Sequence, residues 1–461
     1  MATIPQSSLF SWNQLDVASD LDRLRLVLSA LPDEPLVRFL EERRGHGRDD
    51  YPVRPTWNAL LAGIVFQHPS AASLLRELWR NAELRQLCGF EPLSGMAAVP
   101  SQDAFGRFLG LVIEHRVHLV TIFDTLVNEL GAVLPDLGSR LAVDSKAIAS
   151  AGRPVKDEEK NAEPDGRRDL DADWGRKTYK GKHKDGTAWE KVTSWFGYKL
   201  HLVVDSTHEL PLGFKLTQAS AGDCPELLPL VEELQARHPV IHERAEELAA
   251  DKAYDSGSVK AELYDEHGIK PFLDHRLLWK DDAGQPRALC TERADVFVYD
   301  ELGGVHCQCP SDQRGAAEQR PMAFVGFEHD RATLKYRCPA AFYGGECPGR
   351  AQCEALSPVG VGEYGRTVRV PLDFDRRIFT PVARHTRTWK NAYARRTAVE
   401  RVNSRLDRVL GFEEHFIRGK AKMETRVTLA LVVMLAMALG RIHANQADLM
   451  RSLTAPVRRA A

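Results

Sequence analysis

The sequence lacks a hydrophobic run long enough to cross a membrane. Its longest apolar stretch, 427-VTLALVVMLAMALG-440, covers 14 residues and fits a buried helix instead. The first residues, MATIPQSSLFSWNQ, lack a basic segment followed by an apolar one, so no secretory signal is expected. These absences predict a cytoplasmic protein without a membrane partner.

A large net charge is also missing. The 461 residues carry 62 Lys and Arg against 64 Asp and Glu, so the total charge of −2 does not indicate a nucleic-acid partner. Basic residues are concentrated locally instead, with 14 Lys and Arg against 5 Asp and Glu in 376–426, and 6 against 2 in 176–191. Such local basic surface suits phosphate contact, although a solvated helix face explains most single charge runs.

Two short motifs are missing as well. No Gly-x4-Gly-Lys-Ser/Thr loop occurs, so the sequence predicts no ATP site of that kind. No Cys-x2-Cys pair occurs either, although six of the eight Cys lie between positions 290 and 353. In a reducing compartment, a Cys cluster indicates metal binding or free buried thiols rather than disulfides.

The residues that are present predict several domains, because the chain is too long for one ordinary core. Apolar residues at helical spacing predict helices through 17–135. From 140 to 273 the pattern is strand, strand, strand, helix, strand, helix, strand, which predicts a mixed α/β sheet. The polar, Gly-rich stretch 152–191 is predicted to be a loop. Helix is predicted again for 386–410 and 420–445.

Two acidic residues end strand-like runs in this sheet. Asp144 closes 140-RLAVD-144, and Asp251 closes 247-ELAAD-251. In open α/β sheets, catalytic groups usually lie at the carboxyl ends of the strands. The common alternative for each residue alone is a turn or cap.

A third acid lies in the basic C-terminal segment. Tyr393, Arg396 and Glu400 are spaced by three and four residues, so a helix would place them on one face. Three carboxylates from distant segments can hold two Mg²⁺ ions about 3.5–4 Å apart, which would activate a nucleophile for phosphodiester cleavage. We therefore expect Asp144, Asp251 and Glu400 to be the catalytic metal ligands. An ordinary surface charge is the alternative for Glu400.

Two aromatic segments lie among basic residues. Trp389 in 386-TRTWKNAY-393 is a candidate for stacking on an unpaired base, with core packing as the alternative. The stretch 174-WGRKTYKGKHKDGTAW-189 interleaves aromatics with Lys, as a segment that contacts single strands or the DNA backbone would. A solvated loop is the competing interpretation.

The order and spacing of these motifs resemble the DDE transposases of bacterial insertion sequences, which have a ribonuclease H-like core. The third motif of that family reads Tyr-x2-Arg-x3-Glu-x6-Lys. Tyr393, Arg396 and Glu400 match it, whereas Asp407 stands at the Lys position.

Other segments carry the same resemblance. The run 251-DKAYDS-256 is similar to the Asp-Lys-Gly-Tyr-Asp of the family, with Ala253 in place of Gly, and 143-VDSKAI-148 resembles its first motif. The helical residues 51–110 look like the N-terminal domain found before such cores. The resemblance covers most of residues 20–445.

The resemblance implies DNA contacts for several basic residues. Tyr393 and Arg396 would contact phosphates at the transposon end, and Lys199 would line the same cleft. Arg405 or Arg408 would substitute for the missing Lys. Relatives of this type also carry Cys-rich insertions here, which suggests a Zn²⁺ site made by four thiolates: Cys309, Cys338, Cys347 and Cys353.

We therefore expect an α/β fold: a ribonuclease H-like mixed sheet with flanking helices, preceded by an all-α N-terminal domain and interrupted by a Cys-rich insertion. The expected parts are a helical N-terminal domain that helps bind DNA ends (1–135), the first part of the catalytic core (136–275), the Cys-rich insertion (276–380), the C-terminal helical part of the core (381–445) and a tail (446–461).

The implied reaction is Mg²⁺-dependent nicking at the terminal inverted repeats of the element, followed by strand transfer into target DNA. A homodimer on double-stranded DNA would pair two ends, in the cytoplasm and associated with the nucleoid. Two alternatives stay open. One is a ribonuclease H-like nuclease that cuts without joining. The other is a degenerate or repurposed protein that only binds DNA, which the departures at Ala253 and Asp407 keep in view.

Overall fold

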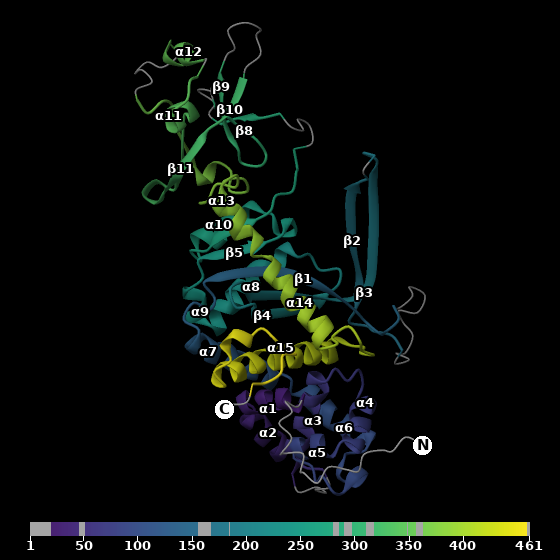
Figure 1. Ribbon diagram of the computed structural model, residues 1–461. Helices are drawn as coiled ribbons and strands as arrows, with labels where there is room; N and C mark the ends of the chain where they lie inside the picture. The colour runs from purple at the N-terminus through teal and green to yellow at the C-terminus, as the bar shows by residue number, and fades with distance from the viewer. Residues whose placement is uncertain are drawn as a thin grey trace, which may run out of the picture.

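The fold was described from a computed structural model. It combines N-terminal helices, a mixed sheet with flanking helices, and a small insertion with sheets of its own (Figure 1). This arrangement confirms the predicted fold class, whereas the proposed domain boundaries stay a prediction. The structure describes residues 20–45, 51–154, 167–183, 185–279, 285–289, 297–309, 318–347, 349–355 and 363–458.

The N-terminal part is helical, as the apolar spacing predicts. Ser70, Asn81 and Ser101 begin three of its helices by accepting a hydrogen bond from the backbone N–H three residues later. Its helices are α1 (Leu21–Ala30), α2 (Glu34–Arg44), α3 (Val53–Val65), α4 (Ala71–Arg80), α5 (Ala82–Cys88), α6 (Gln102–Glu114) and α7 (Val117–Val133).

The central sheet has the order β4-β3-β1-β5-β6. The β1–β3 and β3–β4 pairs are antiparallel, and the β1–β5 and β5–β6 pairs are parallel. The helices α8 (Cys224–Arg237), α9 (Pro239–Glu243) and α10 (Gly257–Asp265) make the crossovers that parallel pairing requires. The strands are β1 (Arg140–Ala149), β3 (Ala188–Asp205), β4 (Leu210–Gln218), β5 (Glu247–Ala250) and β6 (Lys270–Leu273).

The loop predicted for 152–191 is wrong over its second half. Residues 173–182 form strand β2 (Asp173–Lys182), which pairs antiparallel with the first half of β3. This β2–β3 hairpin projects beyond the body of the molecule (Figure 1). Its Gly and charged residues imitate loop composition, which is why the strand pattern was missed. Residues 155–166 lie outside the described part.

The C-terminal helices connect the sheet to the N-terminal part. The helix predicted for 386–410 is interrupted at Arg395 and Arg396, giving α13 (Arg387–Ala394) and α14 (Thr397–Val409). Helix α14 contacts β1 and β3, and α13 contacts β5 and β6. The last long helix, α15 (Lys420–His443), contacts α1, α7 and β4.

Helix α15 is long and apolar enough to pass a composition test for a membrane span, and among the described helices it alone does so. However, 89% of its most apolar window is buried within the structure. The buried helix predicted for this segment is therefore confirmed. One continuous apolar cluster includes α15, α1, α7 and the strands of the central sheet.

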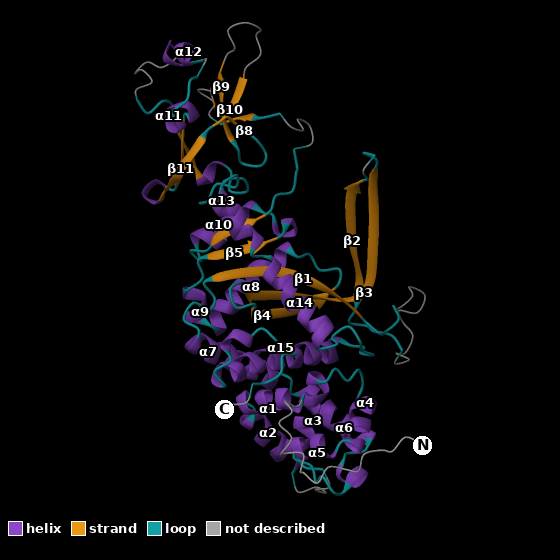
Figure 2. Cartoon of the chain, in the orientation of Figure 1, coloured by secondary structure: helices purple, strands orange, loops and turns teal. Residues whose placement is uncertain are grey.

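The insertion has a separate apolar cluster. Two small antiparallel sheets, ordered β10-β9-β8-β7 and β11-β12-β13, carry it (Figure 2). Its elements are β7 (Arg287–Ala288), β8 (Phe297–Tyr299), β9 (Val305–Cys309), β10 (Glu318–Pro321), β11 (Ala323–Glu328), β12 (Thr333–Arg337), α11 (Pro339–Tyr343), α12 (Arg350–Ala355) and β13 (Thr367–Pro371).

Candidate active site

Asp144 and Asp251 lie side by side on neighbouring strands. In the parallel register, Val143 pairs with Ala250, so the next residue on each strand is one of the two acids. The prediction that Asp144 ends its strand is wrong, because antiparallel pairing with β3 extends β1 to Ala149. Only the parallel pairing with β5 stops before Asp144, and this still places both acids at one edge.

Asp144 and Asp251 differ in burial and in hydrogen bonding. Burial raises the pKa of Asp144 to about 6, and the negative charge of Asp251 adds to this rise. The N–H of Ser145 and the positive charges of Lys177 and Arg396 act in the opposite direction. Asp251 instead caps a short turn and accepts a hydrogen bond from the N–H of Ala253 at 2.7 Å.

Glu400 lies in the first turn of α14, where an Arg holds it. Nη1 of Arg396 donates to Oε1 of Glu400 at 2.7 Å, and the same guanidinium lies 5.5 Å from the centre of the Tyr393 ring. Burial raises the pKa of Tyr393, to which the negative charges of Asp274 and Asp251 also contribute. Tyr393 is therefore near enough to Asp251, and Arg396 to Asp144, for their charges to interact.

A salt bridge fixes how α14 lies on β1. Nζ of Lys146, a residue on the same strand face as Asp144, contacts Asp407 at 2.7 Å and Glu413 at 2.9 Å. Glu400 precedes Asp407 by two helical turns and shares its stripe. The start of α14 therefore lies toward Asp144, in agreement with the electrostatic effect of Arg396 on that residue.

Lys146 is a residue that the sequence analysis missed. The side chain of Lys146 is only 9% exposed, and burial raises the pKa of its partner Asp407. Asp407, which departs from the Lys of the family motif, thus has its opposite charge supplied by the first strand. The signal in the sequence was slight, namely that Lys146 follows Asp144 by two positions and so shares its strand face.

The donor chemistry of the site fits a divalent cation. Asp144 and Asp251 offer carboxylate oxygens from adjacent strands, which are the ligands that Mg²⁺ prefers. Within the described ranges, however, no group of three or more His, Cys, Asp or Glu side chains is arranged to hold a metal. Oε1 of Glu400 is engaged by Arg396, so that pair competes with a cation for this carboxylate.

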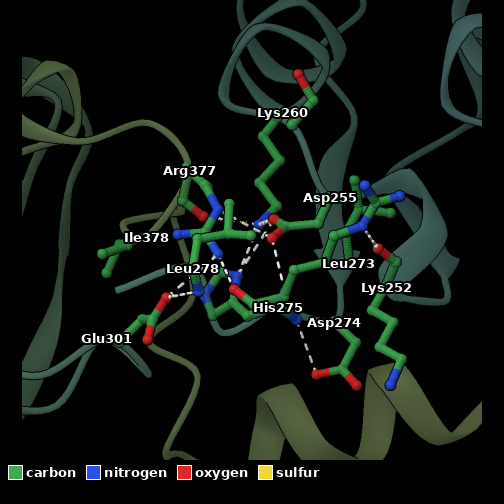
Figure 3. Close-up of polar contacts among 12 residues, drawn as sticks. Lys252, Asp255, Lys260, Leu273, Asp274, His275, Leu278, Glu301, Arg377 and Ile378 are labelled. Carbon is green, nitrogen blue, oxygen red and sulfur yellow. Dashed lines mark hydrogen bonds and ion pairs between the residues drawn. The ribbon is translucent and has the colours of Figure 1, made fainter. Parts of the chain in front are cut away.

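A buried polar cluster supports the loop that carries Asp251. Asp255 accepts from Nζ of Lys260 at 2.7 Å, from Nε of Arg377 at 3.0 Å and from the N–H of Arg276 at 2.8 Å (Figure 3). Burial alone would raise the pKa of Asp255, but hydrogen bonds from His275 and Lys260 hold it well below the usual range. Burial also lowers the pKa of Lys260 to about 8.

Arg276 connects this cluster to the loop backbone. Its guanidinium donates to the carbonyl oxygen of Lys252 at 2.8 Å and also to that of Ala253. The two residues that follow Asp251 are therefore held by the side chain of Arg276, a residue whose backbone N–H donates to Asp255. No sequence pattern predicts this contact, because Arg276 lies outside every motif.

Several predicted DNA-contacting residues are engaged within the protein. Nζ of Lys199 donates to the carbonyl of Ala221 at 2.6 Å and to Asp223 at 3.1 Å. Trp389 is 5% exposed and stacks on Tyr393 with ring centres 5.0 Å apart, which is the core position weighed as its alternative.

The two Arg residues proposed for the Lys position differ. Arg405 is 13% exposed and contacts Glu209 at 3.5 Å, so its charge is used in the core. Burial lowers the pKa of Arg405 to about 10. Arg408 is exposed on α14. Of the two, only Arg408 presents its side chain to solvent.

The proposed zinc site stays a prediction. No disulfide joins Cys338, Cys347 and Cys353 in the described part of the chain. The side chain of Cys309 lies outside the described residues, and the part that is described holds no three-ligand metal group. Metal analysis of freshly purified protein would decide between zinc and free thiols.

Comparison with known proteins identifies a family that this chain matches. Residues 135–436 match the family described as "Transposase DDE domain". A comparison with curated proteins gives no match. Among solved structures, the chain is similar to one titled "Cryo-EM structure of piggyBac transposase synaptic complex with hairpin DNA (SNHP)", with 11% sequence identity and a TM-score of 0.37, over 96% of this chain and 81% of that chain.

Proposed function

Because this chain belongs to the DDE transposase family, we propose that it nicks DNA at the ends of a mobile element and joins those ends to target DNA. Asp144, Asp251 and Glu400 are the proposed acidic residues. What supports this proposal is the β1–β5 register, in which Asp144 and Asp251 follow a directly paired Val143 and Ala250, together with the contact between Arg396 and Glu400. An origin in a bacterial insertion sequence stays a prediction.

The acids would hold two Mg²⁺ ions. When bound, such ions supply an activated water or 3′-hydroxyl and stabilise the leaving oxygen. Asp144 and Asp251 would supply ligands from neighbouring strands. Glu400 would supply the third, although the 2.7 Å contact with Arg396 competes for its Oε1.

Arg396 gives the substrate a means of releasing Glu400. A guanidinium binds phosphate with two parallel hydrogen bonds, and such charge-assisted pairs are strong. A phosphodiester that reaches the site therefore competes with Glu400 for Arg396. Its arrival would bind the DNA to Arg396 and free the third acid in one step.

The proposed partners are the terminal inverted repeats of the element and target DNA, with two copies of the chain pairing two ends. The exposed Arg408 remains a candidate phosphate contact on α14. Lys199 and Trp389 are weaker candidates, because the structure engages both internally. The N-terminal helices are proposed to help bind the ends.

The test uses purified full-length protein, labelled DNA that carries the two ends flanking its coding region, and Mg²⁺. Nicks at the ends and joined products are expected. The substitutions D144A, D251A and E400A should each abolish both products while end binding is kept, whereas E232Q, on the exposed side of α8, should leave them unchanged.

Other outcomes would change the proposal. Cutting without joining would identify a nuclease. Binding without cutting, in Mg²⁺ and in Mn²⁺, would identify a protein that only binds DNA. Full activity in any of the three acid variants would remove that residue from the site.

A further inference from the structure

The β2–β3 hairpin has no structural task that explains its composition. It is a two-stranded ribbon in which Asp173–Lys182 pair with Ala188–Gly197, and it projects beyond the sheet (Figure 2). In an antiparallel pair, directly opposed residues point to the same face. The register therefore assigns every side chain of the ribbon to one of two faces.

On one face, Trp rings lie over glycines, and lysines lie between these rings. Gly175 pairs with Trp195, and Gly181 with Trp189. A Cβ at Gly175 would lie 2.4 Å from the Trp195 ring, and one at Gly181 would lie 2.5 Å from the Trp189 ring. Each indole ring thus lies across a glycine. Where the Trp is exposed, the outer side of its ring stays accessible to a ligand.

Between the two indoles lie the pairs Lys177–Thr193 and Tyr179–Lys191. Tyr179 is 48% exposed and Trp189 is 38% exposed, and both Lys side chains are exposed. We call these four residues, Lys177, Tyr179, Trp189 and Lys191, the ring-and-lysine face. Exposed aromatics that alternate with positive charge suit a polyanion whose bases can stack.

The opposite face is different. Trp174 lies against Phe196 with ring centres 5.7 Å apart, and Arg176 is followed along this face by Val192 and Glu190. Among the described side chains of this face, Arg176 is positive and Glu190 is negative. Trp174 is 55% exposed and Arg176 is also exposed, so removing these two takes an exposed ring and a cation from the same ribbon and serves as the control.

One residue of the ring-and-lysine face lies close to the first acid. Lys177 is near enough for its positive charge to act on Asp144. A strand bound along the hairpin would therefore pass close to Asp144.

We propose that the ring-and-lysine face holds a DNA strand with unpaired bases next to the cut site, with Trp189 and Tyr179 stacking on bases and Lys177 and Lys191 contacting phosphates. Unpaired bases are favoured over duplex because a ring can stack only on a base whose own face is free. This inference rests on the proposed function and names the form of DNA that the site takes.

Binding of fluorescein-labelled oligo-dT to the full chain, measured by fluorescence anisotropy without divalent metal, tests the proposal. We expect the W189A/Y179A variant to bind this single strand at least about tenfold more weakly. We expect K177Q/K191Q to lower the slope of log K against log salt by about 1.4, which is about 0.7 for each Lys removed. A duplex of the same length should lose little affinity with W189A/Y179A.

The control W174A/R176Q should bind the single strand nearly as tightly as the native chain, and circular dichroism should show every variant folded. The proposal is overturned if W189A/Y179A retains affinity, if the control variant shows the loss instead, or if single strand and duplex weaken equally. D144A separates the two claims. This variant should bind oligo-dT normally, whereas its cutting activity tests the proposed function alone.

Discussion

At the scale of single residues, α14 carries an acid where the family motif has a Lys, and a Lys of the first strand pairs with that acid. Asp407 stands where a cation was expected, and Lys146 supplies the cation from β1, 261 positions away in sequence. Asp144 and Asp251 could be predicted because each follows a short apolar run. The Lys146–Asp407 pair could not, since no local pattern joins residues so far apart.

Removing Lys146 should therefore destabilise the protein. In K146A, Asp407 stays partly buried without its cation, and leaving such a group unpaired costs about 1–3 kcal/mol. Urea unfolding should show this loss, and the double variant K146A/D407A should recover most of it. A K146A variant as stable as the native chain would mean that the 2.7 Å contact contributes nothing.

Arg396 should matter to the reaction more than to folding. R396A frees Glu400 but removes the guanidinium proposed to bind phosphate, and the loss of one such positioned donor typically costs about 10²–10³-fold in rate. We expect single-turnover cleavage to fall by about 100-fold, while the midpoint of urea unfolding changes little. R396K should restore only part of the rate, because an ammonium cannot bind phosphate with a planar pair of donors.

At the scale of elements, the hairpin and the Asp251 loop are segments whose conformation depends on tertiary contacts and cannot be predicted from local sequence pattern. The sequence predicted the order β1, β3, β4, α8, β5, α10 and β6, because their apolar residues repeat at regular spacing. It missed β2, whose glycines are needed under Trp189 and Trp195 rather than in a turn. It also missed the break at Arg395 and Arg396, which no Gly or Pro marks.

The polar cluster around Asp255 should show a characteristic pH dependence. The pKa of Asp255 is lower in the folded than in the unfolded chain, so its stabilising contribution is present above about pH 4, where an unfolded Asp is ionised. The contribution is lost as the pH falls below that value. Breaking such a buried pair costs about 3–5 kcal/mol, so D255N should lower the free energy of unfolding at pH 7 by that amount.

The same variant should lose less stability than the native chain between pH 4 and pH 2, because the carboxylate that would be protonated is gone. Chemical unfolding at several pH values measures both effects. D265N is the control, since Asp265 pairs with Arg376 at 41% exposure and such exposed pairs contribute less than about 1 kcal/mol. Equal behaviour of the two variants would contradict the role given to Asp255.

At the scale of the whole molecule, the N-terminal helices and the central sheet share one apolar cluster through α15, whereas the insertion has its own. The sequence predicted both helical parts and the insertion. It could not predict that α15 would contact α1, α7 and β4, because an apolar helix carries no sign of its partners.

A chain without residues 1–135 should therefore fail to fold cooperatively, since α15 would expose the surface that α1 and α7 cover. Replacing residues 285–371 by a short Gly-Ser linker should leave a cooperative unfolding transition, because the second cluster is separate. Circular dichroism and thermal unfolding compare the two. A folded truncated chain would show that the shared cluster is dispensable.

The pairing of Arg396 with Glu400 has a consequence for the cell. Between encounters with DNA, one of the three acids is neutralised by its neighbour, so the resting protein should have little tendency to gather magnesium. An endonuclease that assembles its cutting centre only on contact with a phosphate chain does little harm while it diffuses. A chromosome that carries such an element would then be exposed to breakage mainly where the protein has already bound.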